Sequence, residues 1–181
     1  MVFRVIVISI IRDGMLEERI EMARKLVAYF SATGVTAKVA ELIADAAGAD
    51  VYQIQPGVPY TAADLNWMDK NSRSSVEMND KKIRPSMVKR SLQIEDYDVV
   101  FLGFPIWWYV APTIINTFLE SFDIAGKKII LFATSGGSGF GKTVEELKVS
   151  VTDDTQIVEG KLLNGKQTLA GVSEWIRSLK L

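Results

Sequence analysis

The chain has 181 residues and a formal net charge of −1, with 21 Lys and Arg residues against 22 Asp and Glu residues. This balance provides no strongly basic surface, so neither a nucleic acid nor a membrane is expected as a partner. The sequence contains no cysteine and no histidine. Their absence excludes disulfides, thiolate chemistry and every Ser-His or Cys-His mechanism, and we expect no metal site. Redox chemistry would therefore need a bound cofactor.

The length suits one domain with a full hydrophobic core. No apolar run reaches the length that crosses a membrane. The apolar stretch at the N-terminus is not followed by the small-residue cleavage site of a signal peptide. We therefore expect a cytoplasmic protein.

Residues 1–21 fit poorly with the rest of the chain, and we predict that they are an N-terminal extension to a domain spanning 22–181. Val2–Ile11 has the composition of a strand. One hypothesis is that translation naturally begins at Met22, because codons for Glu17, Glu18 and Arg19 can resemble a bacterial ribosome-binding site. The alternative is a genuine extra strand or an ordered N-terminal arm.

A phosphate-binding turn is the strongest signal in the sequence. The apolar run Leu26–Phe30 stops at SATGVT, residues 31–36, and a helical apolar pattern follows at once, which predicts a strand, a tight turn and a helix over 35–47. Backbone N–H groups at the helix start, Gly34 and the hydroxyls of Ser31, Thr33 and Thr36 suit a phosphate. The alternative is an ordinary turn capped by Ser and Thr. A Walker loop and a dinucleotide-binding turn are excluded, because the required Lys and further glycines are missing.

The segment that follows the second predicted strand, Ala49–Gln53, is long and polar. Residues 57–90 exceed the usual length of a plain connector, and loops of this kind are commonly functional. We expect a collar near the ligand with a short helix around Ala62–Trp67. The alternative is that Trp67 only packs the loop onto the sheet.

Strands and helices alternate through the rest of the chain. We predict strands over 99–104, 128–133 and 155–158, a loop over 161–166, and helices that begin at Pro112, cover 142–148 and end the chain over 172–179. This alternation predicts an α/β doubly wound parallel sheet. Ligands of such sheets bind beyond the carboxyl ends of the strands.

Two further loops at strand ends carry ligand-binding chemistry. Residues 105–109, PIWWY, offer aromatic faces, of which we expect one to pack inward and at least one to stack on a flat ligand. Residues 134–139, TSGGSG, offer hydroxyls and accessible backbone. A single phosphate together with a flat ring system describes flavin mononucleotide, FMN.

The sequence also resembles the flavodoxin family from about residue 25 to the C-terminus. The resemblance rests on YFSATGVTAKVAELIA (29–44), PYTAADLNWMDKNSRS (59–74), GFPIWWYVAPTIINTFLESFD (103–123) and FATSGGSGFGKT (132–143). It implies a five-stranded sheet of order 2-1-3-4-5 and a bound FMN. The phosphate would lie on Ser31, Thr33, Gly34, Val35 and Thr36. The ring would lie against Pro105, Ile106, Trp107, Trp108, Tyr109, Thr134, Ser135, Gly136, Gly137 and Ser138.

The leading functional hypothesis is an FMN-dependent oxidoreductase that uses NAD(P)H to reduce a small acceptor such as a quinone or a nitro compound. Trp67, Asn66 and Arg73 are candidates for shaping the acceptor or nicotinamide site, although Arg73 could equally be a surface charge. The alternative is an electron carrier that passes single electrons between redox proteins. The near-neutral charge favours the enzyme, since electron-shuttling flavodoxins are typically acidic. A third hypothesis is a binding domain that uses no flavin.

Overall fold

The computed structural model describes residues 6–12, 15–21 and 23–181. Its centre is an all-parallel sheet of β3 (Lys25–Tyr29), β4 (Asp50–Gln53), β5 (Val99–Pro105), β6 (Lys128–Thr134) and β7 (Gln156–Leu162). The spatial order is β4-β3-β5-β6-β7. Counted along the domain, this is the order 2-1-3-4-5, so the predicted α/β doubly wound fold is confirmed.

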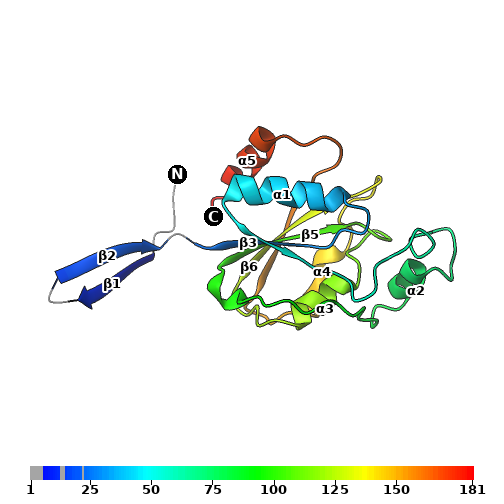
Figure 1. Cartoon of the computed structure of the whole chain (residues 1–181), viewed down its shortest axis with the longest axis horizontal. Coiled ribbons are helices and arrows are strands. Elements are labelled where there is room, and N and C mark those ends of the chain that lie inside the picture. The colour runs from blue at the N-terminus through cyan, green and yellow to red at the C-terminus, as the bar shows by residue number, and fades with distance from the viewer. Residues whose placement is uncertain (1–5, 13–14, 22) are drawn as a thin grey trace.

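Helices cover both faces of this sheet (Figure 1). Helices α1 (Val35–Ala47) and α5 (Leu169–Ser178) lie on one face, and α3 (Ile114–Glu120) and α4 (Thr143–Lys148) lie on the other. The central strands are buried from both sides, which explains their continuous apolar runs. On the α1 side, Phe101 packs with Trp175, and on the α3 side Phe118 and Phe104 belong to the second core.

The N-terminal residues form a separate two-stranded sheet. Strand β1 (Ile6–Arg12) pairs antiparallel with β2 (Met15–Glu21). Figure 1 shows this hairpin apart from the parallel sheet. The strand expected over Val2–Ile11 is thus found in part, as β1, and residues 2–5 lie outside the described residues. Met22, the proposed initiator, also lies outside them. Strand β2 was not predicted.

The prediction of a short helix around Ala62–Trp67 is wrong. Residues 62–65 form turns, because the Asp64 carboxylate accepts hydrogen bonds from Thr61 N (2.8 Å) and Thr61 Oγ1 (2.7 Å). The helix of this segment is α2 (Arg73–Asn79). Its start is capped by Ser72, whose hydroxyl accepts from Ser75 N at 3.3 Å.

Three other boundaries differ from prediction. Strand β7 continues to Leu162, into the expected loop over 161–166, because Gly160 allows β7 to pass close to β6, where the register shifts. A Cβ at Gly160 would lie 2.0 Å from Leu131 O. Helix α3 starts two residues after Pro112, and α5 starts at Leu169 because Thr168 caps it, accepting from Gly171 N at 3.2 Å.

Candidate functional site

Three loops meet at the carboxyl edge of the sheet, where the sequence places the ligand. The hydroxyls of Thr36, at the start of α1, and Thr134, at the end of β6, are hydrogen-bonded at 2.9 Å. Ile106 N, after β5, donates to Thr134 O at 2.8 Å. The loops after β3, β5 and β6 therefore form one continuous surface.

The loop after β3 combines a left-handed glycine with a buried hydroxyl. Gly34 has φ +85°, which favours glycine, and a Cβ added there would meet nothing within 4 Å. The side-chain oxygen of Ser31 is buried without a hydrogen-bond partner among the described residues. Buried hydroxyls are almost always hydrogen-bonded, so the Ser31 hydroxyl keeps the capacity for one more polar contact, as do the buried hydroxyls of Tyr52 and Thr113. Thr36 is only 1% exposed, and its hydroxyl is already bonded to Thr134.

The loop after β5 is a tight two-residue turn with unusual backbone. Trp107 and Val110 exchange hydrogen bonds of 2.9 and 3.0 Å, which places Trp108 at φ 46° and Tyr109 at φ 68°. Bulky residues rarely adopt this region, and such strain is concentrated at functional sites. Gly141 supports the turn, since a Cβ there would lie 2.4 Å from Tyr109 O.

The two tryptophans of this turn have different surroundings. Trp107 packs edge-to-face against Phe30 and Tyr60, with ring centroids 5.6 and 5.3 Å apart. Trp108 is 39% exposed and Tyr109 is 69% exposed. One ring packs inward, as expected, and two rings are available to a ligand.

The loop after β6 is ordered by its own side chains. Ser135 Oγ accepts from Gly137 N at 3.1 Å and from Ser138 N at 2.7 Å. Ser135 N donates in turn to Asn164 Oδ1 at 2.7 Å, from the segment after β7. Asn164 was not predicted, because its contact with Ser135 spans the β6–β7 connection.

A pocket of about 520 Å³ lies between these loops and the polar segment. From the polar segment, it is lined by Leu65, Trp67 and Ser74. Trp67 is 71% exposed, which rules out the alternative that it plugs the loop onto the sheet. The polar segment therefore forms a collar beside this pocket, and its inward-packing residue is Tyr60.

Tyr60 holds the collar against the sheet through a compact polar cluster. Its hydroxyl donates to Glu77 Oε2 at 2.5 Å, and the Arg73 guanidinium lies 3.9 Å from the centre of its ring. Arg73 also donates to Glu77 Oε1 at 2.7 Å. Burial, together with the Glu77 carboxylate, raises the pKa of Tyr60. Arg73 is therefore not a simple surface charge, and it is not among the residues that line the pocket.

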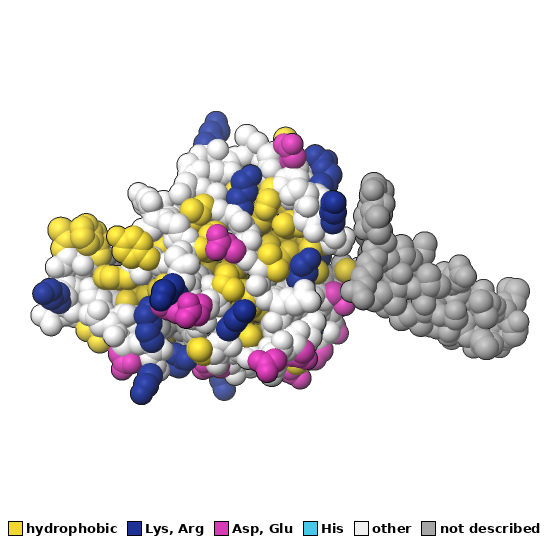
Figure 2. Space-filling view, turned by 180° about the vertical axis from the view of Figure 1, so that it is seen from behind, with side chains coloured by type: hydrophobic (Ala, Val, Ile, Leu, Met, Phe, Trp, Pro, Cys, Tyr) yellow, Lys and Arg dark blue, Asp and Glu magenta, His cyan; other side chains and the backbone are white. Residues whose placement is uncertain are grey.

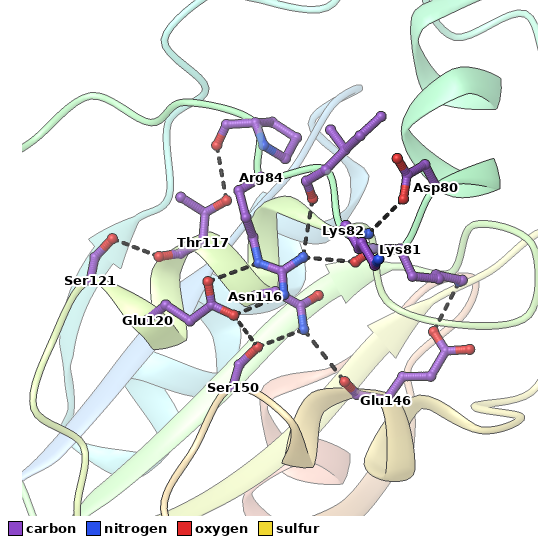
Figure 3. Close-up of polar contacts among 12 residues, drawn as sticks. Asp80, Lys81, Lys82, Arg84, Asn116, Thr117, Glu120, Ser121, Glu146 and Ser150 are labelled. Carbon is purple, nitrogen blue, oxygen red and sulfur yellow. Dashed lines mark hydrogen bonds and ion pairs between the residues drawn. The ribbon is translucent and has the colours of Figure 1, made fainter.

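A second network anchors the far end of the same segment (Figure 3). Arg84 binds both carboxylate oxygens of Glu120 on α3, at 2.8 Å each. Glu120 also accepts from Ser150 Oγ at 2.6 Å, and Lys81 pairs with Glu146 on α4 at 2.9 Å. The collar is thus tied to two helices below the sheet.

Within the described ranges, no three acidic side chains converge as a metal site would require. No helix in those ranges is both long enough and apolar enough to span a membrane.

The sequence model of the flavodoxin family matches residues 24–179. The chain belongs to the flavodoxin family. Two Bacteroides proteins proposed to be flavoproteins have similar crystal structures. That from Bacteroides eggerthii is 48% identical with a TM-score of 0.81, covering 88% of this chain and 99% of its own. That from Bacteroides uniformis is 50% identical with a TM-score of 0.80, covering 86% of this chain and 98% of its own.

A flavoprotein from Lactobacillus acidophilus, solved in complex with FMN, shares the fold at 19% identity. Its TM-score is 0.64, and the match covers 85% of this chain and 99% of that chain. No protein of curated function matches the chain.

Part of the predicted cofactor site lines the pocket of about 520 Å³. Its predicted lining residues are Thr33, Pro105, Ile106, Trp107, Trp108, Tyr109 and Ser138. Other predicted residues lie in the same loops but do not line the pocket, namely Ser31, Gly34, Val35, Thr36, Thr134, Ser135, Gly136 and Gly137. Ala32, Leu65 and Ser74 also line the pocket and were not predicted, although all three lie within the family motifs.

Proposed function

We propose that this flavodoxin-family chain binds FMN and uses NAD(P)H to reduce a small acceptor such as a quinone or a nitro compound. The observation that carries the proposal is the unpartnered buried hydroxyl of Ser31 beside an aromatic-lined pocket. The FMN complex of the Lactobacillus acidophilus protein, which shares the fold, supports the choice of cofactor.

The loop over residues 31–36 suits the phosphate group. Ser31 offers a hydroxyl that has no hydrogen-bond partner in the described part of the chain, and Gly34 leaves open space beside the backbone. The 13-residue helix α1 starts at Val35, so the positive end of its dipole and its first N–H groups lie at this loop. These features stabilise a phosphate without a Lys or Arg side chain.

The pocket suits the flat ring. Its volume falls within the range of small-molecule sites, and Trp108 and Tyr109 provide aromatic faces at its edge. The buried packing of Trp107 on Phe30 and Tyr60 holds the turn in place. The residues of this chain thus bind, orient and partly shield the ring.

FMN, when bound, supplies the redox chemistry that a chain without Cys or His side chains lacks. We favour an enzyme over an electron carrier because the net charge of −1 lacks the strong overall acidity that helps electron-shuttling flavodoxins dock on basic redox proteins. We propose that the protein acts in the cytoplasm, because NAD(P)H is the reductant of the proposed reaction.

The test is an FMN titration of the purified protein by fluorescence quenching, followed by anaerobic addition of NADPH or NADH. We expect tight one-to-one FMN binding and prompt bleaching of the flavin absorbance. Stable yellow protein that neither nucleotide bleaches would support the electron carrier instead. A protein that does not bind FMN would overturn the proposal.

A further inference from the structure

A second hollow adjoins the pocket proposed for FMN. It measures about 710 Å³ and is lined by Trp67, Met68, Lys70, Ser75, Asn79 and Trp108. Trp67 and Trp108 line both hollows. A ligand bound in the second hollow therefore contacts the same two rings as a ligand in the first. Figure 2 shows hydrophobic side chains gathered at the end of the molecule away from the N-terminal residues, where the α2 segment lies.

The lining of the second hollow combines three large apolar side chains with one positive charge and two polar residues. Trp67 and Met68 are 71% and 73% exposed, which is unusual for side chains of their size. Lys70 forms no ion pair or side-chain hydrogen bond with the residues that the structure describes. Among the described residues, no Asp or Glu lines the hollow, so Lys70 provides its one charged side chain.

We propose that this hollow is the acceptor subsite and that it selects a flat aromatic acceptor with an anionic substituent. Trp67, Trp108 and Met68 provide surfaces for a ring. Lys70 provides the counter-charge for a carboxylate or sulfonate, and Asn79 on α2 provides a polar contact. This inference rests on the proposed function, since it names the acceptor class of the same site.

Equilibrium dialysis of the FMN-loaded protein tests the charge preference without relying on turnover. The two probes are 4-nitrobenzoate and its neutral methyl ester. We expect the wild-type protein to bind the acid about fivefold more tightly than the ester, as for a partly exposed ion pair. The preference should fall at high salt, because salt screens exposed charges.

The variant Lys70→Gln should abolish the preference for the acid. The matched control is Lys82→Gln, another exposed lysine of the same segment, which should keep it. Equal binding of acid and ester by the wild-type protein, or an unchanged preference in Lys70→Gln, would overturn the inference.

NADPH is also anionic with a flat ring, so steady-state kinetics must separate donor from acceptor. We expect Lys70→Gln to raise the KM for 4-nitrobenzoate and not the KM for NADPH. The opposite pattern would overturn the acceptor assignment. FMN titration of each variant tests the proposed function separately. If FMN does not bind, dialysis of the FMN-free chain still decides whether Lys70 selects the acid.

Discussion

At the scale of single residues, the buried hydroxyl of Ser31 predicts opposite effects of one substitution on stability and on FMN binding. Its buried hydroxyl lacks a partner, and leaving such a group unsatisfied costs about 1–3 kcal/mol. Ser31→Ala should therefore leave the FMN-free protein at least as stable as wild type and weaken FMN binding by about tenfold or more. Thermal melts and FMN titrations measure the two effects. The control is Tyr52→Phe, which also removes a buried unpartnered hydroxyl and should not change FMN affinity.

Gly34 tests the phosphate loop through its backbone. Gly34→Val should abolish FMN binding, because the added side chain would occupy the open space where the phosphate approaches, while the fold is retained. Gly48→Val is the matched control, since Gly48 also has positive φ, at 59°, and open space around its Cβ position. Both variants should lose about 1–2 kcal/mol of stability from backbone strain. FMN titration should separate them, and equal affinities would refute the phosphate assignment.

At the scale of elements, the strained turn from Trp107 to Val110 assigns different roles to adjacent tryptophans. Trp107→Ala should lower the free energy of unfolding by about 3 kcal/mol, because its ring packs against Phe30 and Tyr60. Trp108→Ala should cost little stability and weaken FMN binding by up to about tenfold, the value of one aromatic stacking contact. Urea unfolding and FMN titration measure the two quantities. The same profile for both variants would contradict this division of roles.

The ion pair between Arg84 and α3 predicts a pH-dependent contribution to stability. Arg84, assisted by Ser150, holds the pKa of Glu120 below its usual value of 4.5. Because the folded-state pKa is the lower one, the pair stabilises the protein above pH 4.5 and loses this effect as the pH falls through the folded-state pKa. Glu120→Gln should therefore cost up to about 1 kcal/mol at pH 7, a small value because the pair is partly exposed, and much less at pH 3.

Urea unfolding at both pH values tests this prediction. The exposed Glu159 on β7 offers a control, Glu159→Gln, that should change stability little at either pH. An equal loss for Glu120→Gln at pH 7 and pH 3 would show that the charge of Glu120 is not what stabilises the contact.

At the scale of the whole molecule, the N-terminal hairpin and the flavodoxin-family domain are separate sheets. Among the residues that the structure describes, strand β3 pairs with β4 and β5 and not with the hairpin, and the family match begins at residue 24. Removing residues 1–21 should therefore leave the melting temperature and the FMN affinity unchanged. Differential scanning calorimetry and FMN titration would check this. A lower melting temperature would show that the hairpin stabilises the domain.

The sequence by itself determined the sheet, its helices and the chemistry of the three loops. These features follow from local patterns: continuous apolar runs predict buried parallel strands, helical spacing predicts the helices, and SATGVT is one contiguous motif. Parallel strands bring their carboxyl ends to one edge, so the meeting of the loops also follows from the pattern.

Only the tertiary structure decided which side chains line the pocket. It placed the helix of the polar segment at Arg73–Asn79 rather than at Ala62–Trp67, turned Trp107 inward and Trp108 outward, and used Thr36 to bind Thr134. Each of these depends on contacts between residues far apart in the sequence. The spacing of residues along the chain does not encode such contacts, because that spacing is the same whichever distant residues they contact in the fold.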